Sequence, residues 1–307
     1  MTVLIATSVV RGSRQGESHG GIYLVDFDRR QVAQPVDWNT INIDWQGRGW
    51  DRGLRGIAFD GEKILVAASD ELFVFDRDFN NLASYRSPHL QHCHEIFRYR
   101  RRLYITSTGF DAILGFDLDE LNFSWGLRLA KVADGFRATP FLPGAIDGPP
   151  PSNELHLNNV HCTPAGLYIS GMRTGSLLRY TGKQLEKVGP LPSGCHNAQP
   201  FRNGVLFNDT AADLVRFVSK DKQRSFHVPH YDPELLTHTD FDDSRTARQG
   251  FARGLCDLGK GVVAAGSSPS TITLHDFESM QTTLSINLTM DVRNAVHGLE
   301  VWPFDAA

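Results

Sequence analysis

The sequence lacks several features that would assign it to a familiar class. No apolar run approaches the roughly 18 to 20 residues that a membrane-spanning helix needs, so we expect no such helix. The opening MTVLIATSVVRG has no basic region before its short apolar stretch and is interpreted as a strand, not as a secretion signal. Only 4 cysteines occur in 307 residues. Without an export signal, they predict reduced thiols and a cytoplasmic location.

Blocks of like charge and common catalytic motifs are also missing. Apart from the basic turn YRRR at residues 99–102, lysine and arginine form no block, and the formal net charge is −4. We therefore expect neither nucleic acid nor a membrane surface as a partner. The sequence contains no GxSxG, no phosphate-binding P-loop, no dinucleotide fingerprint and no HExxH. None of the enzyme classes that carry those motifs is indicated.

What the sequence does contain is one pattern of short alternating strands, repeated six times. The clearest copy is QHCHEIFRYRRRLYITSTGFDAILGFD at residues 91–117, and the sixth copy is split between the two ends of the chain. Six copies at roughly forty to sixty residues predict an all-β, six-bladed β-propeller. We expect a single domain, closed by pairing of the N- and C-terminal strands. The expected blades are 1–38 with 294–302, 52–88, 91–130, 154–190, 194–228 and 251–290.

The residue that heads the inner strand of each copy carries the strongest chemical signal. Histidine heads alternate copies, at His94, His196 and His297. Alternate members of a six-membered ring form a triangle, so we expect these three imidazoles to converge. Three neutral imidazoles with an open position can hold a divalent transition metal such as iron, zinc or manganese. The alternative is that the histidines bond backbone groups at the turns, as a scaffold.

The other three heading residues are Arg55, Asn158 and Arg253. The two arginines could be bidentate clamps for a carboxylate or phosphate beside the metal, or they could cap the blade ends by pairing with Asp51 and Asp257. In the ring these three residues alternate with the histidines, so two guanidiniums and the amide of Asn158 would stand between the imidazoles, and Asn158 is a further candidate catalytic residue. Glu95, which follows the first histidine, is a candidate general acid or base.

Two segments rich in proline, glycine and polar residues interrupt the repeats, at 131–153 and 229–250. We expect the first to be neither strand nor helix. Both precede an inner strand, so they should lie at the same mouth as the heading residues, where they would form either a lid or a partner-binding surface. The roles of His92, His156 and His161 are left open.

The order of strands, the segment ELHLNNVHCTPAGLYISG and the closing HGLEVW resemble the NHL-type six-bladed β-propellers. This group includes gluconolactonase-like and strictosidine-synthase-like proteins and uncharacterised bacterial relatives. The resemblance implies a divalent ion held by Glu, Asn and Asp, but only Asn158 is of that kind here. Lactonase activity is therefore not carried over. The histidines are closer to metal-dependent propeller lyases and to iron oxygenases, which have seven blades and four histidine ligands.

The functional hypothesis from the sequence is a metal-dependent enzyme acting on a small anionic metabolite by elimination, hydrolysis or oxygenation. A site without carboxylate ligands stays cationic, which favours an anion. The alternatives are a non-catalytic propeller that binds a peptide or protein partner, and a metal-free acid/base enzyme. The sequence indicates no oligomeric state.

Overall fold

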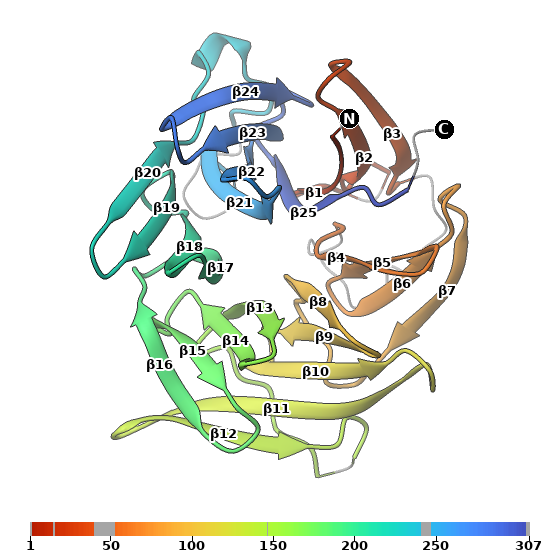
Figure 1. Cartoon of the computed structure of the whole chain (residues 1–307). Helices are drawn as coiled ribbons and strands as arrows, with labels where there is room; N and C mark the ends of the chain where they lie inside the picture. The colour runs from red at the N-terminus through yellow and green to blue at the C-terminus, as the bar shows by residue number, and fades with distance from the viewer. Residues whose placement is uncertain (1, 15, 40–52, 146, 241–246, 305–307) are drawn as a thin grey trace. The chain divides into compact units, whose positions relative to one another are not determined.

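The computed structural model describes residues 2–14, 16–39, 53–145, 147–240 and 247–304. The chain is an all-β, six-bladed propeller built from six antiparallel sheets (Figure 1). One sheet has the order β25-β1-β2-β3, so the last strand pairs with the first. The predicted fold class and the predicted pairing of the two ends are therefore confirmed.

Apart from the closing strand β25 in the first sheet, each sheet is a meander of consecutive strands. The first sheet contains β1 (Val3–Val10), β2 (Gly21–Asp26), β3 (Gln31–Asp37) and the closing strand β25 (Asn294–Val301). The second contains β4 (Ile57–Asp60), β5 (Lys63–Ala68), β6 (Glu71–Phe75) and β7 (Asn81–Arg86). The third contains β8 (Ile96–Tyr99), β9 (Arg102–Ser107), β10 (Ala112–Asp117), β11 (Asn122–Val132) and β12 (Gly135–Phe141).

The fourth sheet contains β13 (Leu157–Thr163), β14 (Gly166–Gly171), β15 (Ser176–Tyr180) and β16 (Leu185–Pro190). The fifth contains β17 (His196–Phe201), β18 (Gly204–Asp209), β19 (Leu214–Ser219) and β20 (Gln223–His227). The sixth contains β21 (Gly250–Asp257), β22 (Val262–Ser268), β23 (Thr271–Asp276) and β24 (Gln281–Asn287). A single 3₁₀ turn, η1 (Pro233–Leu235), is the helical element of the described residues.

The chain divides into two compact units. The terminal unit comprises Met1–Ile57, Asn208–Arg216 and Gln223–Ala307. The mid-chain unit comprises Ala58–Phe207 and Phe217–Lys222. Each unit has its own apolar core.

The cores lie between neighbouring sheets, because alternate side chains of each strand face the adjacent sheet. In the mid-chain unit, Leu72 and Leu114 belong to one buried cluster between the second and third sheets. Ile113 and Ile169 belong to the next cluster, between the third and fourth sheets. Fully burying one such side chain contributes about 1.5–3 kcal/mol, so the stacked sheets hold the inner strands in place.

In the terminal unit, the closing strand packs into the buried core. Val296 and Leu299 of β25 cluster with Leu4 and Val25 of the first sheet and with Ile272 of the sixth. The backbones approach closely here: a Cβ on Gly298 would lie 2.2 Å from the carbonyl oxygen of Arg55. The pairing of the two chain ends therefore supports the core as well as the sheet edge.

The expectation that residues 131–153 contain no strand is wrong. β11 continues to Val132, and β12 pairs with it along its full length, from Gly126↔Phe141 to Val132↔Gly135. Pro140 is tolerated because β12 is the outer edge strand, where a missing N–H need not interrupt a ladder. In the second insert, residues 241–246 lie outside the described residues, as does Asp51.

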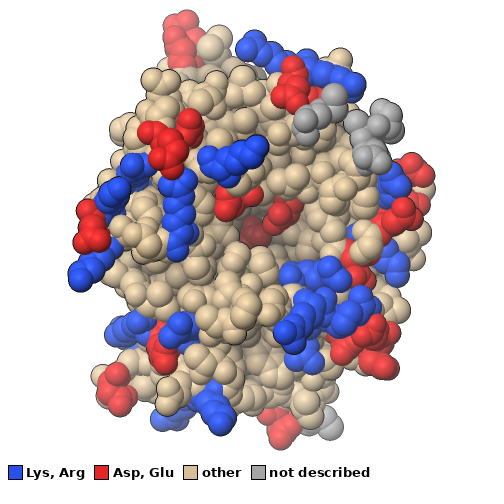
Figure 2. Space-filling model, in the orientation of Figure 1, with Lys and Arg blue, Asp and Glu red and all other residues tan. Residues whose placement is uncertain are grey.

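Among the described residues, no helix is long and apolar enough to cross a membrane. On the face drawn in Figure 2, basic and acidic side chains are interspersed. Among the described residues there are exposed ion pairs, such as that of Arg77 with Glu62 at 3.1 Å. Exposed pairs of this kind contribute little to stability.

Candidate metal centre

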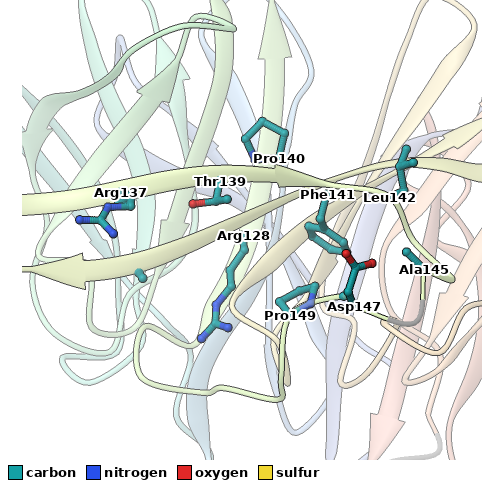
Figure 3. A pocket seen from close by; sticks show the side chains of 11 residues that line it. Arg128, Arg137, Thr139, Pro140, Phe141, Leu142, Ala145, Asp147 and Pro149 are labelled. Atoms are coloured by element: carbon teal, nitrogen blue, oxygen red, sulfur yellow. The ribbon is translucent and has the colours of Figure 1, made fainter.

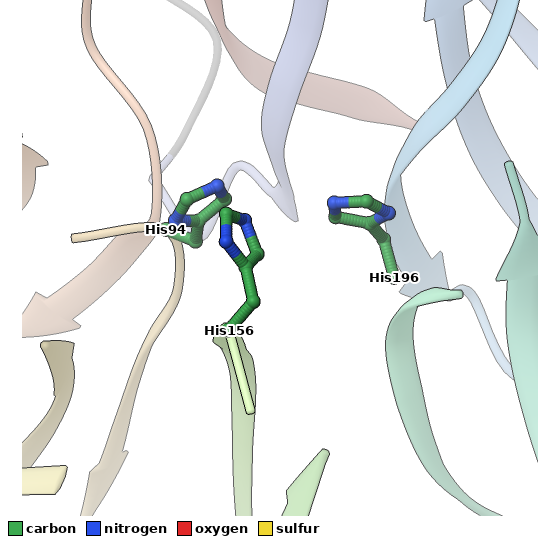
Figure 4. A group of neighbouring side chains, drawn as sticks. All are labelled: His94, His156 and His196. Carbon is green, nitrogen blue, oxygen red and sulfur yellow. The ribbon is translucent and has the colours of Figure 1, made fainter. Parts of the chain in front are cut away.

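Three histidines of the mid-chain unit, His94, His156 and His196, lie together (Figure 4). One ring nitrogen from each lies within 4.8 Å of the other two. The ring centroids of His94 and His156 are 5.2 Å apart, and those of His94 and His196 are 6.1 Å apart. His94 and His196 are buried, and His156 is half-buried.

His94 lies just before β8, and its ring is held by oxygen atoms on one side. Its Nδ1 is 2.8 Å from the carbonyl oxygen of His92 and 3.0 Å from the hydroxyl of Thr108. The Thr108 hydroxyl donates to the carbonyl of Leu157, so its oxygen accepts from the ring. The backbone N–H of His94 donates to Thr106 at 2.9 Å. The tautomer that satisfies these contacts has the proton on Nδ1.

His196 is the first residue of β17, and its ring follows the same rule. Its Nδ1 is 3.1 Å from the carbonyl oxygen of Gly194, which can only accept a hydrogen bond, so Nδ1 carries the N–H that donates it. Gly194 has a φ of +82°, a conformation that glycine adopts at little cost. The side chain of Asn158 donates to the carbonyl of Cys195 at 2.8 Å and so fixes the turn that leads into the strand.

His156 lies two residues before Asn158, in a turn that is bound by the buried carboxylate of Asp111. That carboxylate accepts the backbone N–H groups of Glu154 at 2.6 Å and of His156 at 2.9 Å, and the hydroxyl of Ser152 at 2.8 Å. His156 is held at φ +53°, a region that few residues other than glycine adopt. Its Nδ1 is 3.0 Å from the side-chain oxygen of Asn153.

In all three rings Nδ1 therefore faces an oxygen acceptor. A neutral imidazole that donates from Nδ1 carries its lone pair on Nε2, which is the form that binds a metal. Hydrogen bonds of this kind at the second nitrogen are the usual way in which a protein orients metal-binding histidines. In their neutral form the three rings would therefore offer Nε2 lone pairs, so the cluster is a candidate nitrogen donor set.

Two of the three residues are those that the sequence predicted, and His156 is the one that it left open. The sequence contains one signal for it: a histidine stands two residues before the heading residue in two copies, His92 before His94 and His156 before Asn158. In the structure both of these preceding histidines have a φ of +53°. His297 is buried in β25 of the terminal unit. Its convergence with the other heading histidines stays a prediction.

The other histidines whose roles the sequence left open, and Glu95, make separate contacts in the mid-chain unit. His92 supplies the carbonyl that accepts from His94. His161 lies farther along β13 and packs against Phe97, with ring centroids 4.3 Å apart; burial lowers its pKa to about 4. Glu95 accepts a hydrogen bond from the side chain of Asn197 at 3.0 Å, so the residues that follow two of the clustered histidines are joined.

Arg55 and Arg253 lie in the terminal unit. Arg55 is buried, and its carbonyl accepts the hydroxyl of Thr7. Arg253 is half-buried and lies 5.0 Å above the ring of Phe251. Their predicted role as clamps stays a prediction at this point.

A separate pocket of about 560 Å³ lies on the outer strands of the third sheet (Figure 3). Arg128 and Thr139, from β11 and β12, line it together with Asp147 of the following loop. Arg128 donates to the carbonyl of Pro150 at 3.4 Å. None of the clustered histidines lines this pocket.

Comparisons with known proteins establish the fold and no more. No protein-family model and no curated protein matches the chain. A protein of unknown function from Bacteroides caccae is 11% identical, with a TM-score of 0.59 over 99% of this chain and 100% of that chain. A chain of the nidogen/laminin complex is 9% identical, with a TM-score of 0.57 over 98% of each chain. Virginiamycin B lyase from Staphylococcus aureus is 11% identical, with a TM-score of 0.47 over 81% of this chain and 73% of that chain.

Proposed function

We propose that this protein is a metal-dependent enzyme whose centre is formed by His94, His156 and His196, and that it acts on a small anionic molecule. The observation that carries the proposal is the shared orientation of the three rings. Each directs Nδ1 to an oxygen acceptor, and one nitrogen of each lies within 4.8 Å of the others. A scaffold role at three separate turns would not require the rings to converge.

The donor set fits a divalent transition ion such as zinc, iron or manganese. With metal–nitrogen bonds of about 2.0–2.1 Å, tetrahedral ligands lie about 3.3 Å apart. The nitrogens of the cluster, within 4.8 Å of one another, would move inward by small ring rotations. Three protein ligands leave a fourth position for water or substrate, which is the arrangement of catalytic sites rather than structural ones.

Charge argues for the class of substrate. Three neutral imidazoles leave the charge of a divalent ion uncompensated, and the cluster contains no carboxylate. An anionic ligand would therefore be favoured at the open position. A bound ion would supply Lewis acidity, polarising a carbonyl or lowering the pKa of a water molecule. Glu95, which directly follows His94 and accepts a hydrogen bond from Asn197, is a residue that could accept or return a proton there.

The test is elemental analysis of protein purified without a histidine tag, together with binding titrations of zinc and manganese. We expect a near-stoichiometric ion in the parent and its loss in His94→Ala and His196→Ala. For the third ligand, His156→Asn is the sharper variant, because asparagine tolerates the left-handed backbone while the imidazole is removed.

Two further variants decide between ligand sets. His161→Ala removes a neighbouring histidine on β13 and should keep the metal. His297→Ala should also keep it if His156 is the third ligand. Metal that is lost in His297→Ala but retained in His156→Asn would restore the triangle predicted from the sequence. A parent that contains no metal and takes none up would refute the proposal.

A further inference from the structure

In the terminal unit, three guanidinium groups surround the ring of Phe251. The Cζ atom of Arg11 lies 3.8 Å from the ring centroid, that of Arg253 lies at 5.0 Å and that of Arg248 at 5.2 Å. Arg55 interacts electrostatically with both Arg11 and Arg253. Arginines that stack on an aromatic ring keep their edge N–H groups available for a ligand.

The backbone around Phe251 is shaped to present this ring. Gly250 has a φ of +87°, and a Cβ there would lie 2.5 Å from the carboxylate of Asp213. Phe251 itself is held at φ +48°, an outlier for a bulky residue, and its N–H donates to Asp213 at 3.1 Å. Strain of this kind persists where the surrounding structure enforces it, which is frequent at ligand sites.

The arginines at the ring differ in their electrostatic surroundings. Arg248 is 2.7 Å from the carboxylate of Asp213 and donates also to the carbonyl of Thr210. Arg253 experiences the positive charges of Arg11 and Arg55, and its Nε is buried without a hydrogen-bond partner among the described residues. Burial, followed by the charges of Arg11 and Arg55, lowers the pKa of Arg253 well below its ordinary value. Burial and the charges of Arg55 and Arg248 likewise lower the pKa of Arg11 to about 9.

We propose that Arg11, Arg55 and Arg253 form a binding site for the oxyanion group of a small molecule, a carboxylate or a phosphate, with Phe251 as its wall. Guanidinium groups bind both anions through paired N–H bonds, and such charge-assisted bonds are about twice as strong as neutral ones. An anion would give Arg253 Nε an acceptor and would offset the repulsion among the three cations. The site is formed by the terminal unit alone and does not rest on the metal centre.

The test measures anion binding by the full chain after metal has been removed and the chelator dialysed away. Inorganic phosphate and succinate are titrated separately by calorimetry, and thermal unfolding is followed in each, against sodium chloride of equal ionic strength. We expect one or both anions to bind and to raise the Tm more than chloride does. The stronger of the two identifies the tetrahedral or the planar group as the ligand.

Arg253→Gln and Arg11→Gln should each weaken that binding by about 10- to 100-fold, the value of one or two charged hydrogen bonds. At low salt and without an added anion, neither variant should have a lower Tm than the parent, because each substitution removes repulsion between like charges. Arg29→Gln, an exposed arginine of the same unit near Asp26, is the matched control and should bind as the parent does. If Arg253→Gln does not fold, Arg11→Gln decides alone.

Two outcomes would overturn the site. One is a parent whose Tm responds to phosphate and succinate no more than to chloride. The other is unchanged anion affinity in the folded arginine variants. Because metal is absent throughout, neither outcome bears on the histidine centre, and His94→Ala should bind the anion as well as the parent.

Discussion

Replacing Asp111 by asparagine tests whether the turn that carries His156 is built for the metal centre. The buried carboxylate accepts four donors: the hydroxyl of Ser152 and the N–H groups of residues 154, 155 and 156. Asparagine has nearly the same shape, but only one of its two terminal atoms can accept. If its oxygen takes the place that serves Ser152 and Glu154, its NH₂ group faces the N–H of His156.

The magnitude follows from that exchange. One buried N–H loses its acceptor, which costs about 1–3 kcal/mol. The remaining bonds lose their charge assistance, which roughly halves their strength. We therefore expect Asp111→Asn to lower the free energy of unfolding by about 2–4 kcal/mol. Because the lost bond fixes the backbone of the turn that carries His156, the imidazole is positioned less well, and loss of an orienting contact weakens metal affinity about 10- to 100-fold.

The assay is urea denaturation for stability and competition with a chromophoric chelator for metal affinity. Asp213→Asn is the matched control, because Thr210 and Asp213 repeat the spacing of Thr108 and Asp111, and Asp213 likewise accepts the N–H of a residue in the left-handed conformation. It should lose stability yet keep the parent's metal affinity. The reasoning fails if Asp111→Asn binds metal as tightly as the parent, or if Asp213→Asn loses the same affinity.

Three further outcomes are expected. Gly298→Ala places a Cβ 2.2 Å from the carbonyl oxygen of Arg55 and should lower the free energy of unfolding, measured by urea titration, by about 3 kcal/mol or more. In the control Gly189→Ala the nearest contact of the new Cβ is 3.5 Å away, so the same titration should show a change of less than about 0.5 kcal/mol. Burial raises the pKa of Glu300 from 4.5 to about 7, so the folded state holds that proton more tightly and stability is lost as the pH rises between those values. Glu300→Gln should therefore match the parent near pH 4 and exceed it at pH 8 in urea denaturation; equal stability of the two proteins at pH 8 would contradict this assignment. A chain that ends at His297 loses half of β25 and should show no cooperative unfolding by circular dichroism, while one that ends at residue 302 keeps the pairing with β1 and should unfold as the full chain does.

The six blades could be predicted because they depend on patterns that are local in sequence. Strand, tight turn and strand recur with a fixed order of apolar residues, so each copy predicts one antiparallel sheet, and six such sheets are observed. The pairing of the ends also follows, since a closing strand without partners of its own needs the N-terminal ones. The strand Gly135–Phe141 is missed because glycine and proline indicate a loop wherever edge position is unknown.

The candidate site could be predicted only in part, for a related reason. His94 and His196 occupy equivalent positions in their repeats, and equivalent positions in a propeller lie at the same level around its axis. His156 does not head a strand: its position depends on a left-handed turn bound by Asp111, 45 residues earlier. The cluster around Phe251 depends in the same way on Asp213, 38 residues before it. Such carboxylate contacts leave no periodic signal in the sequence.

The three clustered imidazoles come from three successive sheets, so an ion can be held only after residues 94, 156 and 196 have all reached their places. An ion that binds the folded chain and not the unfolded one stabilises it by mass action, by about 2.7 kcal/mol when its free concentration is a hundred times Kd. The lifetime of the mid-chain unit against proteases would then depend on metal supply. In metal-depleted medium the same amount of newly made chain would then be degraded faster.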